Sequence, residues 1–405
     1  MSEARLRVGM DVASLGDAAL TGIPLYIESL LREFLSDPQE DWTLVGGPSA
    51  PDPARILTER GVPLPPTCRT VPAVDARFAA RAPGLATRPP FSHVVPKLDG
   101  RVLMPIGKAA TALRVGRVDV FHHTAILRLP PSCARRHIVT IYDLSTRLFP
   151  EAHNRVNIAE WERVFAFARD HADLVITDSE SARQDVIRMV GVEPSRVRSI
   201  LLGPRPLPNP DGNRRREIRE KWGLGEKRFV LAAGSLDPRK NLPRLIEAFA
   251  QIAHEPFLQN TQLVLTGAKL HGAEGVQSAI RKHQLENRVL PTGYASDEEL
   301  AALMCECDAF AYPSLYEGFG LPVLEALSLG APVVTSDVSS LPEVAGDAAL
   351  LVPPTDVNAL SSALHRLLTD LPFAAALRVR GPLQAARFSW RDCAAQHRQA
   401  YREWQ

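Results

Sequence analysis

The chain has 405 residues, of which 45% are apolar and 23% are charged, and its formal net charge is +1. This length predicts two or three domains with sizeable cores, and the composition is that of an ordinary globular protein. A net charge so close to zero excludes a molecule that binds nucleic acid through its overall charge.

The first residues, MSEARLRVGMDVAS, lack the continuous apolar stretch of a signal peptide. No window holds 18 uninterrupted apolar residues, so no membrane-spanning helix is predicted. The five cysteines are scattered and favour a reducing compartment over a disulfide framework. We therefore expect a cytoplasmic protein.

The first half of the chain alternates short apolar runs with helical patterns. Helices are expected around 27–34, 158–168 and 181–190, and residues 48–75 are rich in proline and expected to be irregular. This alternation predicts a parallel sheet with helices on both faces. The expected strands are 6–12, 42–45, 118–121, 137–141, 174–177 and 197–202.

The segment 203–213, GPRPLPNPDGN, interrupts the pattern with four prolines and marks a domain boundary. The alternation then resumes, so the chain reads as two doubly wound α/β units. The second unit has expected strands at 229–233, 262–266, 289–292, 309–312, 332–335 and 349–352. Its expected helices are 214–222, 242–252, 297–304, 357–368 and 390–404.

Residues 77–117 carry eight basic side chains and one acidic one. Leu103, Ile106 and Leu113 give this region an apolar side, and a cationic amphipathic segment can lie on an anionic membrane. The alternative is a solvated, arginine-rich surface.

The first motif with chemistry is GSLDPRKNLPRLIEAF, which starts at Gly234 where an expected strand ends. It brings Arg239 and Lys240 to a helix start, whose free N–H groups and partial positive charge favour an anion. Arginine can grip two phosphate oxygens at once and lysine acts as a point charge, so a diphosphate fits. The alternative is a solvated basic loop with Asn241 as a helix cap.

The second motif is PSLYEGFGLPVLEALSLGAPVV, which starts at Pro313 and leads from a strand into a helix. Its two glycines, Gly318 and Gly320, allow close approach of the backbone to a ligand. Glu317 is placed to reach a sugar or hold the loop, and the carboxylate of Glu325 can accept hydrogen bonds from two ribose hydroxyls. Alternatively, the two glutamates are ordinary loop and helix residues.

The second motif resembles the Glu-x7-Glu motif of retaining family-four glycosyltransferases of the GT-B fold. The resemblance is tight over residues 229–353 and looser over 1–205. It implies that Glu317 lies near the donor sugar, that Glu325 binds the ribose, and that Arg239 and Lys240 stabilise the leaving diphosphate. The other donor-binding residues that we assign are Gly22, Gly234, Gly267, Gly318, Phe319, Gly320, Leu321 and Pro322.

The resemblance also implies the domain organisation. We predict an N-terminal acceptor-binding domain over 1–205 and a nucleotide-sugar donor domain over 206–386. The tail, FSWRDCAAQHRQAY, resembles the GT-B helix that crosses back to the first domain, so 387–405 is predicted to do so.

One position departs from many relatives, which have His-Asp where this chain has Tyr142-Asp143. Tyr142 can donate one hydrogen bond but cannot be cationic, and it can equally be a packed aromatic at a strand end. Asp143 is our candidate to hold the acceptor or support positive charge at the reacting carbon. His122 and His123, after another strand, are candidates for acceptor binding, with a structural role as the alternative.

No Asp-x-Asp triplet occurs in the chain, and we predict metal-independent transfer without a cofactor. The donor is expected to be a nucleotide sugar, with GDP-mannose first and a dTDP- or UDP-sugar next, because the chain resembles bacterial mannosyl- and rhamnosyltransferases of surface polysaccharides. The acceptor is expected to be a glycan or lipid-linked oligosaccharide, with peripheral membrane contact through 77–117. Alternatives are a non-catalytic sugar-nucleotide-binding partner, a sugar-nucleotide epimerase and a phosphorylase.

Overall fold

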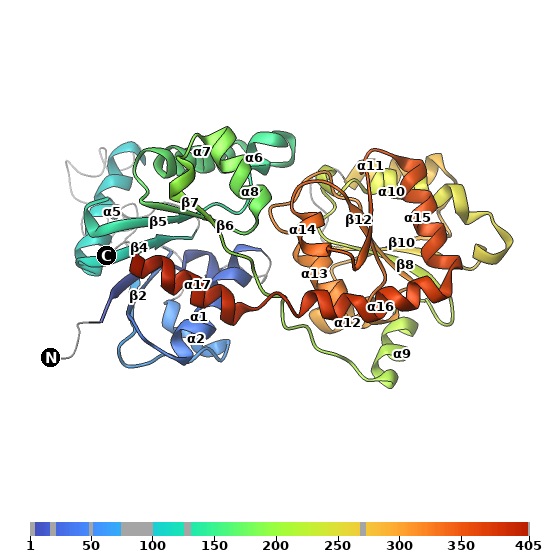
Figure 1. The fold of residues 1–405 in the computed structure, drawn as a ribbon, viewed down its shortest axis with the longest axis horizontal. Helices are drawn as coiled ribbons and strands as arrows, with labels where there is room; N and C mark the ends of the chain where they lie inside the picture. The colour runs from blue at the N-terminus through green and yellow to red at the C-terminus, as the bar shows by residue number, and fades with distance from the viewer. Residues whose placement is uncertain are drawn as a thin grey trace, which may run out of the picture.

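The structure, a computed structural model, describes residues 5–16, 22–47, 52–73, 100–124, 131–267 and 273–403. Figure 1 shows two domains side by side, with the C-terminal helix lying across the N-terminal domain. Among these residues, no helix combines the length and the apolar character needed to cross a bilayer.

The N-terminal domain contains a seven-stranded sheet in the order β3-β2-β1-β4-β5-β6-β7, and every strand pair is parallel. Its helices are α1 (Ile23–Ser36), α2 (Pro53–Glu59), α5 (Gly100–Val115), α6 (Ser145–Leu148), α7 (Arg155–Asp170) and α8 (Glu180–Asp185), the last continuing in a π-helical turn (Val186–Val190). The strands are β1 (Arg7–Asp11), β2 (Asp41–Gly46), β3 (Arg69–Pro72), β4 (Val118–His123), β5 (Ala134–Thr140), β6 (Leu174–Thr177) and β7 (Val197–Ser199).

The C-terminal domain contains a six-stranded parallel sheet in the order β10-β9-β8-β11-β12-β13. The strands are β8 (Phe229–Ala233), β9 (Gln262–Thr266), β10 (Val289–Gly293), β11 (Ala309–Tyr312), β12 (Val333–Ser336) and β13 (Ala349–Val352). The helices are α9 (Gly212–Lys221), α10 (Leu242–Ala253), α11 (Ala273–Lys282), α12 (Asp297–Glu306), α13 (Leu321–Ser328), α14 (Leu341–Ala345), α15 (Val357–Thr369) and α16 (Leu371–Ala385). The two parallel sheets confirm the predicted fold class.

The linker and the C-terminal segment cross between the domains side by side. Residues 200–211 have no regular structure, and the indole Nε1 of Trp390 donates a hydrogen bond to the carbonyl of Pro204 at 2.9 Å. Helix α17 (Trp390–Glu403) then packs against α1. Tyr401 is fully buried beside Phe34 and Trp42, with ring centroids 6.0 and 6.2 Å away, so apolar packing holds this helix on the N-terminal domain.

The segment 48–75 is not wholly irregular, because it contains α2 and the edge strand β3. Asp52 caps α2 by accepting a hydrogen bond from the amide of Ala54, and Ile56 and Leu57 are buried. The basic region 77–117 lies partly outside the described residues, which include its helix α5 from Gly100 onward.

Candidate active site

Loops from both domains meet where their strands end. Tyr142 and Asp143 follow β5, Ser179 follows β6, and the loop 313–320 follows β11. In the C-terminal sheet the chain order reverses between β8 and β11. Open α/β sheets bind ligands beyond the carboxyl ends of their strands at such a point, so the second motif lies where a ligand is expected.

The two domains approach each other closely at Gly318. A Cβ atom added there would lie 2.0 Å from the carbonyl oxygen of Tyr142 and 2.9 Å from the Cβ of Asp143. The hydroxyl of Ser179 donates a hydrogen bond to the carbonyl of Gly318 at 2.6 Å. Glycine is therefore required by contact with the opposite domain. Asp143, whose Oδ1 accepts from the amide of Ser145 at 2.8 Å, lies directly against the second motif.

Tyr316 and Glu343 add polar contacts between the domains. The hydroxyl of Tyr316 accepts from the amide of Leu144 at 3.2 Å and donates to Asp185 at 3.0 Å. The carboxylate of Glu343 accepts from the amide of Glu180 at 3.0 Å, at the start of α8. The loops around the second motif therefore hold the two domains together through hydrogen bonds.

Glu317 forms the centre of a buried charged cluster. Its Oε2 lies 2.7 Å from Arg239 Nη1, and its Oε1 lies 2.6 Å from Lys240 Nζ. The hydroxyls of Ser314 and Tyr312 donate to the same Oε1 at 2.6 and 3.0 Å. These side chains lie at the end of β11 and in the loops that follow β8 and β11, so the two sequence motifs form one site.

The pKa values in this cluster follow from burial and from the two opposite charges. Burial alone would raise the pKa of the Glu317 carboxyl, but Arg239 and Lys240 outweigh it and lower this pKa to about 2. Burial lowers the pKa of Lys240, and Glu317 partly restores it. Glu317 is therefore ionised at neutral pH, and the guanidinium of Arg239 keeps its charge.

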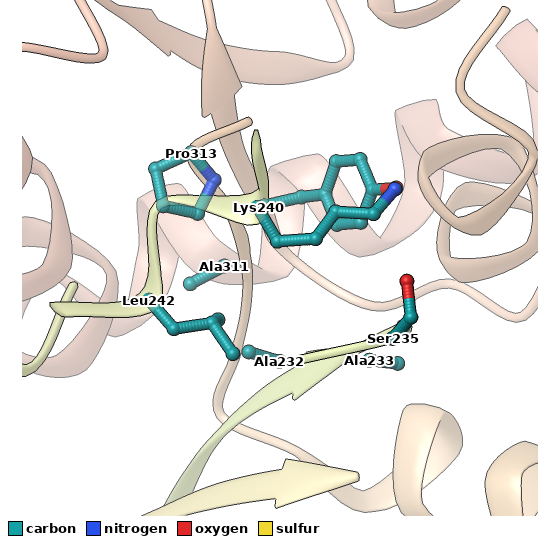
Figure 2. A pocket seen from close by; sticks show the side chains of 9 residues that line it. Ala232, Ala233, Ser235, Lys240, Leu242, Ala311 and Pro313 are labelled. Carbon is teal, nitrogen blue, oxygen red and sulfur yellow. The ribbon is translucent and has the colours of Figure 1, made fainter. Parts of the chain in front are cut away.

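A small pocket opens beside Lys240 (Figure 2), whose side chain extends along it. Arg239 and Lys240 end a short 3-10 turn that follows the β8 loop. Asn241 begins α10 but makes no capping bond; its side-chain amide donates to the carbonyls of Pro313 at 3.0 Å and Pro354 at 2.6 Å. The pocket is lined by Ala232, Ala233, Gly234, Ser235, Lys240, Leu242, Ala311, Tyr312 and Pro313.

The glycines after β8 and β9 bring two backbones together. Gly267 has a φ of +147°, and a Cβ atom there would lie 1.8 Å from the carbonyl oxygen of Gly234. Only glycine allows this contact, which places the end of β9 beside the loop that carries Lys240.

The glycine-rich part of the second motif, where it enters α13, is held by contacts within the C-terminal half of the chain. Gly320, with a φ of +104°, precedes α13, whose first two residues are Leu321 and Pro322. Phe319 is buried with its ring centroid 5.9 Å from that of Phe388. The loop after β12 supports it: Ser340 donates to the carbonyl of Phe319 at 2.7 Å.

Glu325, on α13, lies in a second buried ion pair. Its two carboxylate oxygens accept from Nε and Nη2 of Arg205 at 3.0 and 3.1 Å. Burial raises the pKa of this carboxyl, and Arg205 offsets part of that effect. Arg205 comes from the linker between the domains, and no local sequence pattern indicates this contact.

The matching family model is that of glycosyl transferases group 1, over residues 214–383. The O-antigen chain mannosyltransferase B of Escherichia coli is 33% identical over 75% of this chain and 78% of its own length. The chain belongs to the glycosyl transferases group 1 family. The serotype-specific mannosyltransferase WbdA of Escherichia coli is 31% identical over 58% of this chain and 28% of its own.

The fold of this group 1 glycosyltransferase is GT-B. The structure of HepE from Anabaena in complex with UDP and glucose has a TM-score of 0.71 to it, with 18% identity over 98% of this chain and 99% of HepE. At this identity the likeness concerns the fold. Membership of the group 1 family makes the chain a glycosyltransferase, which implies a sugar donor and a glycan acceptor.

In this glycosyltransferase the two predicted histidines contact residues of the N-terminal domain and of α17. His122 is fully buried, with Nδ1 2.8 Å from the hydroxyl of Tyr401 and Nε2 2.7 Å from that of Thr140. His123 is also buried, 3.0 Å from the ring of His137. Burial holds the pKa of both predicted histidines well below 6.5, so both are neutral. His122 connects the sheet to α17.

Two further predicted residues, Tyr142 and Gly22, lie in the N-terminal domain. The hydroxyl of Tyr142 donates to the carbonyl of Thr124 at 2.6 Å, and its ring meets that of Tyr26 edge-on with centroids 5.2 Å apart. The contact of Tyr142 with the second motif is made by its backbone carbonyl. Gly22 is exposed and immediately precedes α1, with a φ of +55°.

Four residues contribute to the site although the sequence analysis did not single them out. Arg205 reaches Glu325 from the linker, Tyr316 and Glu343 bridge to the N-terminal domain, and Ser340 braces the second motif. Tyr316 lies inside the motif, next to Glu317, so a polar role for its hydroxyl could have been considered. The others are ordinary residues in their local sequence.

Proposed function

We propose that the chain is a retaining, metal-independent hexosyltransferase that transfers a sugar from a nucleoside-diphosphate sugar to a glycan or lipid-linked acceptor. The buried cluster of Arg239, Lys240 and Glu317, set against Asp143 of the other domain, carries this proposal. GDP-mannose is our first candidate donor, because curated relatives are mannosyltransferases. A dTDP- or UDP-sugar is the next.

The cluster suits the stabilisation of a leaving diphosphate. Lys240 uses two of its three N–H donors on Tyr312 and Glu317, and Arg239 uses Nη1 on Glu317 and on the carbonyl of Tyr316. Further N–H groups of both side chains can therefore donate to phosphate oxygens. Charges fixed in this way stabilise negative charge as the glycosidic bond to phosphate breaks.

Asp143 is the carboxylate that the N-terminal domain places against the second motif. In our proposal it orients the acceptor hydroxyl or supports positive charge at the anomeric carbon. Transfer then takes place on one face of the sugar through an oxocarbenium-like state, which retains the configuration. Tyr142, next to Asp143, contributes in our proposal through its backbone carbonyl, which contacts the second motif.

The acceptor side of the proposal includes contact with a membrane through residues 77–117. Within the described part of this region, Leu113 is 85% exposed and Arg114 is exposed beside it on α5. A protein with Arg114→Glu and Arg117→Glu should bind vesicles of anionic phospholipid less than wild type. The control is Arg281→Glu with Lys282→Glu, two exposed residues of α11. Equal binding by all three proteins removes the membrane contact from the proposal.

The first test is a thermal-shift panel of GDP-, UDP- and dTDP-sugars. A ligand at about 100 times its dissociation constant should stabilise the native state by about 2.7 kcal/mol. The shift should disappear in Arg239→Ala/Lys240→Ala. It should persist in Arg281→Ala/Lys282→Ala, because this second Arg-Lys pair, also consecutive in the sequence, is exposed. Stabilisation of both variants alike would contradict the diphosphate site, and no shift for any nucleotide sugar would favour a non-catalytic protein.

The binding donor then enters a transfer assay. Release of the nucleoside diphosphate with a new glycoside whose anomeric proton keeps the donor configuration supports the retaining transferase. Conversion of the donor to an isomeric nucleotide sugar without an acceptor would instead identify an epimerase.

A further inference from the structure

Arg205 makes the only described side-chain ion pairs of the 200–211 linker, and both are with the C-terminal domain. Its guanidinium spans two carboxylates: Nε and Nη2 bind Glu325, and Nη1 binds Asp297 at 2.8 Å. The side chains of Arg205 and Glu325 are 15% and 4% exposed, whereas Asp297 is 49% exposed. Arg205 therefore lies between a buried carboxylate and the solvent.

The backbone around Arg205 is constrained by its neighbours. It stands between Pro204 and Pro206, whose rings restrict the local backbone. The carbonyl of Pro204 accepts the indole hydrogen bond of Trp390, and a Cβ atom at Gly203 would lie 2.5 Å from the amide nitrogen of Trp390. The segment at Trp390, where the chain returns to the N-terminal domain, thus anchors the linker next to Arg205.

The bidentate contact leaves Glu325 with unused acceptor capacity. Each carboxylate oxygen has two lone-pair sites and takes one N–H from Arg205. The planar fork of the guanidinium fixes the plane of the carboxylate, so the remaining sites have set directions. Two adjacent oxygens with one acceptor site each match the two neighbouring hydroxyls of a ribose.

We propose that Arg205 is a positioning residue for the donor nucleotide: it holds the Glu325 carboxylate ionised and oriented to accept the ribose 2′- and 3′-hydroxyls. This inference rests on the proposed function, which assigns Glu325 to the ribose. It makes the interdomain linker a part of the nucleotide site. Loss of Arg205 should weaken the recognition of those hydroxyls more than the binding of the diphosphate.

The test compares GDP with 2′,3′-dideoxy-GDP by isothermal titration, or the corresponding uridine pair if the panel selects UDP. Wild type should prefer the ribonucleotide by about tenfold or more, the scale of a hydrogen bond to a charged group. Arg205→Met should reduce that preference at least fivefold and change the affinity for the dideoxynucleotide less than twofold. Arg205→Lys, which keeps the charge without the fork, should lie between them.

Two further variants test the role of Glu325 and the specificity of the effect of Arg205. Glu325→Gln should abolish the preference for the ribonucleotide. Arg215→Met removes a linker-proximal arginine that contacts Asn209, Pro210 and Glu306, and it should keep the wild-type preference. In transfer, Arg205→Met should raise the donor KM with little change in kcat.

Each contrary result has a distinct meaning. A wild-type preference in Arg205→Met, or tighter binding of both nucleotides by that variant, would overturn the inference; the second result would mean that Arg205 covers Glu325. No preference in wild type would overturn the assignment of Glu325 to the ribose and the inference with it. No binding of any nucleotide by wild type would contradict the proposed function itself.

Discussion

The buried charges around Glu317 provide the sharpest test of the site's electrostatics. Glu317→Gln keeps the shape of the side chain but leaves Arg239 and Lys240 without their common counter-charge. The three side chains are 9%, 14% and 10% exposed, so solvent screens them little. Removing one partner of a buried pair costs about 3–5 kcal/mol. The pKa of Glu317, about 2 against an ordinary 4.5, corresponds to about 3 kcal/mol at neutral pH.

The pH dependence has a definite sign. Because the folded pKa of Glu317 lies below the unfolded one, its stabilisation is complete above about pH 5 and is lost as the pH falls towards 2. The difference in unfolding free energy between wild type and Glu317→Gln should therefore be about 3 kcal/mol at pH 7 and about 1 kcal/mol at pH 3. Urea denaturation followed by circular dichroism measures it, with the m-value checked for constancy.

The control replaces a carboxylate in an exposed pair of the same domain. Glu217, 63% exposed, pairs with Arg214 at 2.8 Å, and Glu217→Gln should cost less than about 1 kcal/mol at every pH. A difference for Glu317→Gln as small as this at pH 7 would refute the reasoning. So would a large difference that stays the same from pH 7 to pH 3, because it would not come from the ionised carboxylate.

Other predictions follow from single contacts. Asp143→Ala should lower the transfer rate with little change in nucleotide affinity; unchanged turnover would remove its proposed role. Gly318→Ala should lower kcat at least about tenfold and enlarge the radius of gyration in X-ray scattering, because its methyl group meets the opposite domain; wild-type kinetics would contradict the observed contact. Gly267→Ala should destabilise by at least about 2 kcal/mol in urea, while Gly212→Ala, with open space around it, should change stability by less than about 1 kcal/mol. Burial lowers the pKa of His397 to about 4, so its unfolded ring takes up a proton below pH 6.5 while the folded ring stays neutral. Between pH 7 and pH 5 the unfolding free energy of wild type should therefore fall by about 2 kcal/mol more than that of His397→Asn; equal falls in both proteins would refute this.

The central strands could be predicted from the sequence because they are buried on both faces. The apolar runs 174–177, 229–233, 262–266 and 309–312 match β6, β8, β9 and β11. Such strands read as continuous apolar segments bounded by polar residues. The edge strand β3 lacks this pattern, since Val71 is its only buried residue. Helix α16 contains Pro382, which local rules treat as a helix breaker.

The candidate site could be predicted only where its residues are contiguous in the sequence. The motifs at 234–249 and 313–334 indicated the charged loop and the glycine-rich loop, because a strand end, glycines and a helix start follow one another locally. Contacts between segments far apart have no such pattern: Arg205 and Glu325 are separated by 120 positions. The histidine pair lies outside both motifs: its role in acceptor binding stays a prediction, and both rings are buried with protein partners.

The two kinds of contact between the domains differ in strength, and this difference determines where the domains separate most easily. At the motif loops, the bridging contacts named above are single hydrogen bonds, such as those of Ser179, Tyr316 and Glu343, each worth about 1 kcal/mol net. Helix α17, in contrast, is held on the N-terminal domain by fully buried aromatic packing around Tyr401. Separating this helix from the domain costs far more free energy. Opening at the loops with α17 still attached therefore costs least, and the 200–211 linker and the return crossing at Trp390 are the segments left to bend. Because Arg205 lies in that linker and contacts Glu325, the bending segment is also tied to the proposed nucleotide site.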